Sequence, residues 1–202
     1  MRVYAESNFV LEVVLEQEQH RACEELLGLA EGRAIELVLP AYALLEPHET
    51  IVRREMEGKE LRRALELRRT QIQRTASLVA EAQLLQAASD LLLRAAQEAT
   101  KRFLDVRTRI LDASRLIAID GAALREASVL AVTFALELPD AVVLASVLTD
   151  ATERPASSIF LNRNTKDFDD PNLRASLRRV DCALIGSFDG GLARVKNTLA
   201  KT

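Results

Sequence analysis

LPDAVVLASVLTDATERPASSIFLNRNTKDF, residues 138–168, is the stretch that decides the fold class. Pro139 suits the first turn of a helix, where a neighbouring carboxylate such as Asp140 is stabilised by the helix dipole. The apolar run 158–161 predicts a short buried strand, and polar residues up to Asp167 follow it directly. Open α/β sheets bind ligands beyond the carboxyl ends of their strands. We therefore expect Asp140 and Asp167 to share one crevice.

Short apolar runs alternate with helical patterns along the rest of the chain. This alternation favours a parallel sheet covered by helices on both faces, because parallel strands need helical crossovers. We predict a three-layer α/β/α sandwich with a mostly parallel central sheet, formed by a single domain over residues 1–202. The expected strands are Arg2–Ala5, Ile35–Leu39, Arg115–Asp120, Ser158–Leu161 and Ala183–Ile185.

The expected helix ends follow from capping and breaking residues. Ser7 or Asn8 is expected to cap a helix that continues through the first helical region as far as Gly32. Pro40 is expected to open the next helix. The pair Gly190-Gly191 predicts a turn before a short closing helix.

Residues 49–114 form a long helical region with one glycine and no proline. A single helix of this length would be on the order of 90 Å long, so it must fold back. We predict a helical hairpin inserted in the domain, here called the helical arm, at about residues 53–114. Its turn is expected either at Ser89-Asp90 or within Thr75–Ser77.

Composition excludes several classes of protein. A net charge of −3 gives no global signature of nucleic-acid binding, so such binding needs a local basic patch. No signal peptide and no membrane-spanning run is recognisable, which predicts a cytoplasmic protein without a membrane partner. Cys23 and Cys182 lie far apart without a metal or redox spacing, which predicts two buried, reduced thiols.

Acidic residues recur at places where a parallel sheet gathers its ligands. With two histidines and no glycine-rich phosphate loop, neither a Ser-His-Asp set nor a nucleotide loop is supported. Taken singly, Glu6 reads as a carboxylate favoured by a helix dipole, and Glu46 as a solvated helical position. Taken together with Asp140 and Asp167 they predict a cluster that a hard cation such as Mg²⁺ or Mn²⁺ would neutralise.

Four segments of the chain resemble the PIN domain, a family of metal-dependent ribonucleases that includes many bacterial and archaeal toxins. Val3–Asn8 is similar to the family's strand ending in Asp-Thr/Ser-Asn, and Leu39–Glu46 to its acidic second-helix segment. Leu138–Ala145 is similar to its Asp-Ala helix start, and Phe160–Phe168 to its Thr-Arg-Asn-x-x-Asp-Phe ending.

The resemblance implies a set of site residues. Four carboxylates would hold Mg²⁺ or Mn²⁺ and carry the catalysis: Glu6, Glu46, Asp140 and Asp167. Ser7 and Asn8 would orient the first of these carboxylates, and Asn164 would support the cluster or take the place of a fourth acid. The family normally has Asp at the position of Glu6, whose side chain is one methylene longer.

Two functions follow from this resemblance. The first is an endoribonuclease that cleaves single-stranded or loop RNA by metal activation of water, as in a toxin–antitoxin pair. The alternative is a catalytically degenerate PIN-like module for binding RNA or protein, which the Glu at position 6 favours. The expected partners are RNA, an antitoxin protein and a second copy of the chain.

The first half of the helical arm carries eight basic residues against four acidic ones between Arg53 and Arg74. These charges form a solvated face, line an interface between arms, or contact RNA phosphates. Arg53 and Arg54 follow Glu46 most closely in the sequence and are the first candidates for RNA contacts. Arg163 and Lys166, within the polar segment beside Asp167, are the second.

Overall fold

The computed structural model describes residues 1–164 and 166–201. The chain divides into a sheet unit, Met1–Pro47 with Val106–Thr202, and a hairpin unit, His48–Asp105. The hairpin unit contains most of the predicted helical arm. Each unit is described by itself below.

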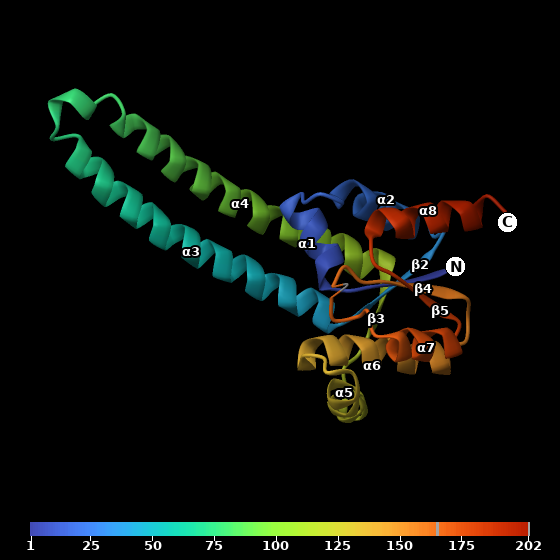
Figure 1. The fold of residues 1–202 in the computed structure, drawn as a ribbon. Coiled ribbons are helices and arrows are strands. Elements are labelled where there is room, and N and C mark those ends of the chain that lie inside the picture. Colours follow the sequence, from blue (N-terminus) through green and yellow to red (C-terminus); the bar gives the residue numbers. More distant parts are fainter. Residues whose placement is uncertain (165, 202) are drawn as a thin grey trace. The chain divides into compact units, whose positions relative to one another are not determined.

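The sheet unit is built on a five-stranded parallel sheet (Figure 1). The strand order is β3-β2-β1-β4-β5, so the first strand of the chain lies in the middle. Every pairing between neighbours is parallel, which confirms the predicted α/β class and the parallel sheet. The strands are β1 Arg2–Ala5, β2 Glu36–Pro40, β3 Ser114–Ile117, β4 Ser158–Leu161 and β5 Cys182–Ile185.

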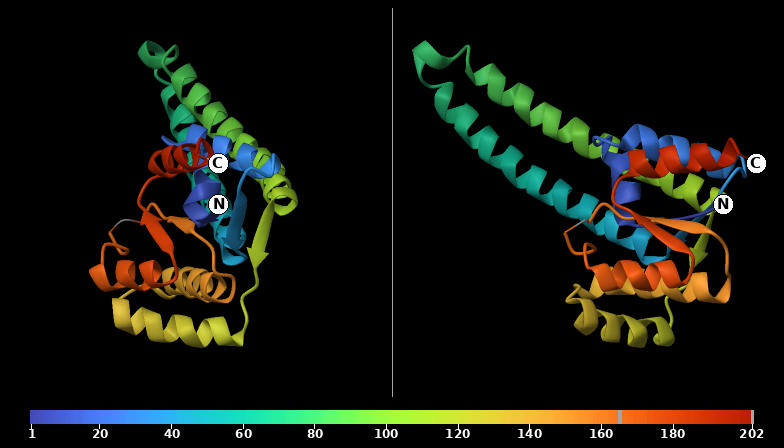
Figure 2. Two further views of the ribbon diagram at one scale, coloured as in Figure 1. Left: turned by 90° about the vertical axis from the view of Figure 1, so that its right-hand side faces the viewer. Right: turned by 45° about the vertical axis from the view of Figure 1, so that its right-hand side comes forward.

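Helices lie on both faces of this sheet (Figure 2), an arrangement compatible with three layers. One face is covered by α1 Ser7–Leu15, α2 His20–Glu31 and α8 Phe188–Leu199. The other is covered by α6 Leu138–Glu153 and α7 Pro171–Arg179, and α5 Gly121–Phe134 packs mainly on α6.

The core explains why the central strands are apolar throughout. All four residues of β1 and of β4 are buried, as expected for strands covered on both faces. Tyr4, Val38 and Phe160 pack from the sheet against Leu144 of α6. Phe168, just beyond the polar segment, meets Phe160 edge to face with ring centroids 5.9 Å apart. This contact anchors the segment that follows β4.

The hairpin unit contains most of two long helices, α3 Tyr42–Ile72 and α4 Ala82–Ala113. The chain reverses between them through a short 3₁₀ helix, Ala76–Leu78, in agreement with the second of the two predicted turn positions. The Arg62 Nε donates to the Ser89 Oγ at 3.3 Å across the pair. A hydrogen bond from Arg69 to Gln86 adds a second link.

Two predicted helix starts and one predicted strand end were wrong. The cap of α1 is Glu6 rather than Ser7 or Asn8, because the Glu6 carboxylate accepts the Asn8 N–H. Pro40 is the last residue of β2 and α3 begins at Tyr42. β3 ends at Ile117, because the Asp120 carboxylate caps α5 by accepting the N–H groups of two following residues.

Two further predictions on the helices covering the first face were also wrong. The first helical region is two helices, because Glu16 adopts a left-handed conformation (φ 49°) that ends α1. The glycines at 190 and 191 lie in the first turn of α8 instead of a separate turn. A Cβ at Gly191 would approach Leu161 Cδ2 within 2.4 Å, so glycine lets α8 lie close to β4.

Both cysteines are buried and free, as predicted. Among the described residues, no single helix is long and apolar enough to cross a membrane; only the pair α5 and α6, bent by 115°, passes that test jointly.

Candidate functional site

The topology brings the four predicted acids to the same region of the sheet unit. Glu6 directly follows β1, the middle strand, and Asp167 follows its neighbour β4. Glu46 lies on α3 after β2, the other neighbour, and Asp140 lies in the first turn of α6. The carboxyl ends of parallel strands share one edge, and open α/β sheets bind their ligands there.

Glu6 is a buried carboxyl at the centre of this edge. Its side chain is 7 % exposed and accepts hydrogen bonds from the Asn8 N–H (2.9 Å to Oε2) and the Arg163 N–H (3.3 Å to Oε1). Burial raises its pKa to about 7, and the charge of Glu46 adds to the rise. Near neutral pH both the protonated and the ionised form of this carboxyl are therefore populated.

Asp140 feels the charge of other carboxylates at this edge of the sheet. Burial raises the pKa of Asp140 to about 6, and the charges of Asp167, Glu46 and Glu137 each add to the rise. Electrostatics therefore couples Glu46 to both Glu6 and Asp140. Carboxylates that lie near one another repel, and this repulsion raises their pKa values.

Two polar side chains hold these carboxylates in place. The Asn164 Nδ2 donates to Asp140 Oδ2 at 3.0 Å and to Asp167 Oδ2 at 2.7 Å, so one amide bridges two acids. The Ser7 hydroxyl donates to Glu46 Oε2. Ser7 was predicted to orient Glu6, and it orients Glu46 instead.

The donor set suits a hard cation that keeps part of its water shell. Its ligands would be carboxylate oxygens, which Mg²⁺ and Mn²⁺ prefer. Across residues 1–164 and 166–201, no three His, Cys, Asp or Glu side chains meet closely enough to form a complete metal site. Mg²⁺ commonly takes only one or two protein carboxylates and retains several waters.

Arg163, one of the predicted RNA contacts, is engaged within the protein. Its guanidinium forms ion pairs with Glu12, which is fully buried, and with Glu18 at 2.5 Å from Nη2 to Oε2. The arginine therefore neutralises a buried carboxylate of α1 rather than standing free for a phosphate. Lys166 is exposed and lies in the same turn as Asp167.

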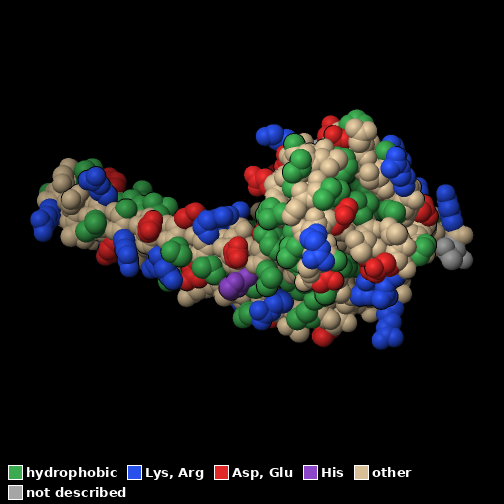
Figure 3. Space-filling view, turned by 90° about the horizontal axis from the view of Figure 1, so that it is seen from below, with side chains coloured by type: hydrophobic (Ala, Val, Ile, Leu, Met, Phe, Trp, Pro, Cys, Tyr) green, Lys and Arg blue, Asp and Glu red, His purple; other side chains and the backbone are tan. Residues whose placement is uncertain are grey.

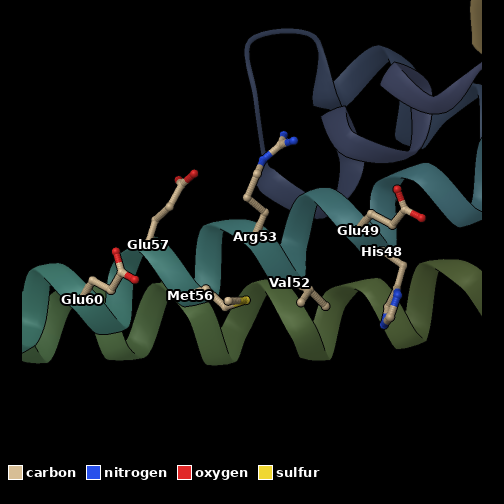
Figure 4. Close-up of a pocket in the computed structure, with 7 residues that line it drawn as sticks. All are labelled: His48, Glu49, Val52, Arg53, Met56, Glu57 and Glu60. Atoms are coloured by element: carbon tan, nitrogen blue, oxygen red, sulfur yellow. The ribbon is translucent and has the colours of Figure 1, made fainter.

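Arg53 and Arg54 are exposed residues of the hairpin unit. Arg53 lines an open groove of about 450 Å³ along α3, shown in Figure 4. His48, Val52 and Met56 project from one side of the helix there, with the His48 ring 5.7 Å from that of Phe103. The remaining residues of the groove carry charge: Glu49, Arg53, Glu57 and Glu60.

A polar network around the buried Asp150 was missed at the sequence level. The Asp150 carboxylate accepts hydrogen bonds from the two Nη atoms of Arg115, each at 2.7 Å, and from the Tyr4 hydroxyl at 2.8 Å. The Glu36 carboxylate accepts hydrogen bonds from the Nε atoms of Arg2 and Arg115, each at 2.9 Å. The sequence did contain a signal for this network, because Arg2 lies in a predicted buried strand and Asp150 in a largely apolar helix. A charged side chain in such a place needs a partner of opposite charge.

The raised carboxyl pKa values predict how stability changes with pH in chelator. A raised pKa means that the folded state keeps protons which the unfolded state releases, so stability falls as pH rises. For Glu6 this loss occurs between pH 4.5 and about pH 7 and lowers the free energy of unfolding by about 3 kcal/mol. For Asp140 it occurs between pH 3.8 and about pH 6.

Urea unfolding between pH 5 and pH 8 would measure this loss. The Glu6→Gln variant should show a flatter profile, while Glu153→Gln, an exposed control, should follow the wild type. An identical slope in the wild type and Glu6→Gln would contradict the assignment.

Comparison with family models, with curated proteins and with solved structures found no match to this chain.

Proposed function

We propose that this protein is a metal-dependent endoribonuclease with a PIN-like fold, acting on single-stranded or loop RNA. One observation carries the proposal. Four carboxylates from four separate segments lie near the carboxyl ends of the central strands, where burial and neighbouring negative charge raise the pKa values of Glu6 and Asp140. Folding such a cluster is unfavourable by itself, and a cation would offset the repulsion.

The residues that would hold Mg²⁺ or Mn²⁺, directly or through water molecules that the ion retains, are Glu6, Glu46, Asp140 and Asp167. The cation would supply Lewis acidity toward a phosphodiester and lower the pKa of a water molecule. The all-oxygen donor set and the amide that Asn164 directs at two of the acids support this fit.

The chain's own groups fix the positions of these acids. Asn164 bridges Asp140 and Asp167, and Ser7 holds Glu46. Backbone N–H groups of Asn8 and Arg163 hold the Glu6 carboxyl from two directions. Because the pKa of Glu6 is about 7, cation binding at neutral pH would release its proton.

A cleavage assay tests the activity directly. Fluorescently labelled single-stranded RNA, a hairpin RNA, duplex RNA and single-stranded DNA would be incubated with Mg²⁺, with Mn²⁺ and with chelator. The proposal expects cleavage of the first two substrates only with a divalent cation. Equal cleavage in chelator would point to a contaminating ribonuclease, and absence of cleavage with both cations would contradict the proposal.

A second candidate function is a PIN-like module that binds RNA or protein without cleavage. The observation that favours it is Glu6, which is longer than the family's Asp and strongly buried. Binding of RNA without cleavage, at any cation concentration, would select this function. An antitoxin protein belongs to the first function as a candidate partner.

Reversing Arg53 and Arg54 to Glu tests RNA contact by the hairpin unit. If these side chains contact phosphates, RNA affinity should fall, and the log–log salt slope should lose roughly one unit for each contact. Filter binding in chelator at several salt concentrations would measure both.

The matched control reverses Arg178 and Arg179, an exposed adjacent pair at the end of α7. It changes the net charge equally. Equal loss of affinity in both double variants would mean that only the overall charge matters, and no loss in either would leave the arginines as a solvated face.

A further inference from the structure

One neutral amide joins two acids of the candidate site. The Asn164 Nδ2 lies 3.0 Å from Asp140 Oδ2 and 2.7 Å from Asp167 Oδ2 and donates a hydrogen bond to each. An amide nitrogen has two N–H donors, and hydrogen bonds to ionised acceptors are stronger than those between neutral groups. The amide hydrogens therefore lie between two carboxylates, where a positive charge is most favourable.

The same two acids have no cationic side chain as a partner. Among the residues that the structure describes, neither Asp140 nor Asp167 forms an ion pair, and Arg163 is already paired with carboxylates of the α1 region. Arg174 pairs with Asp169 at 3.2 Å. Figure 3, which views the molecule from the side of α5, shows Lys and Arg side chains interspersed with Asp and Glu on that face. The amide is thus the positive partner that the two acids share.

Backbone hydrogen bonds hold Asn164 in position independently of its side chain. Its N–H donates to Asn162 Oδ1 at 2.7 Å, and its carbonyl accepts the Phe168 N–H at 3.2 Å. Asn162 and Phe168 are both buried. Because the side chain of Asn164 itself is partly exposed, it can be exchanged without breaking these two links.

The charge of Asp167 helps to raise the pKa of Asp140, and the hydrogen bond from Asn164 acts against this rise. The amide therefore does part of what a cation would do for the two acids. A cation would do it more completely, because it carries a full charge.

We propose that Asn164 is a stand-in for the cation: its amide offsets the repulsion between Asp140 and Asp167 as long as no cation is bound, and a divalent cation displaces it. This inference rests on the cation site of the proposed function, though not on RNA cleavage. It makes Asn164 a positioning residue whose contribution is electrostatic, so the fold can keep the two acids together before an ion arrives.

A series of charges at position 164 tests the stand-in without any metal. Melting temperatures would be measured in chelator at pH 8. Asn164→Ala should melt about 5 °C lower than the wild type or more, because two hydrogen bonds to charged groups are lost. Asn164→Asp, nearly the same shape, should melt lower still, because it adds a third negative charge. Asn164→Lys should melt above Asn164→Ala, and Asn172→Ala, an exposed control, should match the wild type.

Added Mn²⁺ tests the displacement. The ion should narrow the gap in melting temperature between Asn164→Ala and the wild type, raise that of Asn164→Asp most, and leave Asn164→Lys nearly unchanged. Titration calorimetry with Mn²⁺ alone should show that Asn164→Ala binds at least as tightly as the wild type. A group that stayed in place to support the ligands would instead cost 10–100-fold in affinity when removed.

Three results would overturn the stand-in. They are an Asn164→Asp variant as stable as the wild type in chelator, Mn²⁺ affinity lowered tenfold or more in Asn164→Ala, and melting temperatures that ignore Mn²⁺ in every variant. Circular dichroism spectra would confirm that each variant folds. Wild-type RNA cleavage, measured in parallel, reports on the proposed function separately. Cleavage together with either of the first two results would keep the ribonuclease and reject the stand-in, and the expected series without cleavage would do the reverse.

Discussion

Asp140→Asn is expected to lower metal-dependent RNA cleavage by more than about a hundredfold while the fold stays intact. Groups that merely support a metal ligand already cost 10–100-fold when lost, so the loss of a ligand should cost more. Asp140 is the acid on which the charges of Asp167 and Glu46 converge, and it accepts a hydrogen bond from Asn164. The measurement is the initial cleavage rate at saturating Mn²⁺.

The same variant should be more stable than the wild type in chelator. The pKa of Asp140 is raised to about 6. Above that pH the residue is ionised, and its burial and the neighbouring negative charges then destabilise the folded state. Asparagine removes that repulsion. Added Mg²⁺ or Mn²⁺ should then raise the melting temperature of the wild type and leave that of the variant nearly unchanged.

These two measurements separate catalysis from folding. Asp112→Asn, an exposed position, is the control and should match the wild type in both. Unchanged cleavage in Asp140→Asn would remove this residue from the catalytic set. A metal effect on melting without any cleavage would support cation binding by a module that does not cleave.

The sequence predicted best those elements whose signal is local. The strands at 2–5 and 158–161 have the predicted ends, because a strand buried on both faces needs a continuous apolar run and stops where polar residues begin. The strand at 115–120 was predicted too long. Its last residue, Asp120, is better satisfied as the cap of α5 than in a ladder.

The expectation that the acids share one edge of the sheet rests on the topology, because Glu6 and Asp167 follow the neighbouring strands β1 and β4. The hydrogen-bond and ion-pair partners of the polar residues could not be predicted in this way. Ser7 meets Glu46 across 39 residues and Arg163 meets Glu12 across 151, and no local pattern specifies such pairs. Glu12 lies in α1, between apolar residues that give no local sign of its burial. Its complete burial becomes clear only when α1 packs in the sheet unit.

Arg163→Ala is expected to destabilise the protein by about 3 kcal/mol or more, because it leaves the buried Glu12 carboxylate without its cation. The Gln19 N–H would still donate to Glu12 Oε2, at 2.8 Å, but one amide does not replace a guanidinium. Cleavage should fall too. The Arg163 backbone N–H holds Glu6, and Asn164 follows next in the chain.

Adding Glu12→Gln to Arg163→Ala distinguishes this internal role from an RNA contact. Glutamine keeps the acceptor for the Gln19 N–H and removes the stranded charge, so the double variant should regain most of the lost stability. If Arg163 acts through Glu12, cleavage should recover with stability, and the salt slope of RNA binding should stay that of the wild type. If the arginine holds a phosphate, Glu12→Gln cannot restore binding, and the slope should drop by roughly one unit in both variants. A double variant that regains stability but keeps the lowered slope would therefore assign Arg163 to RNA.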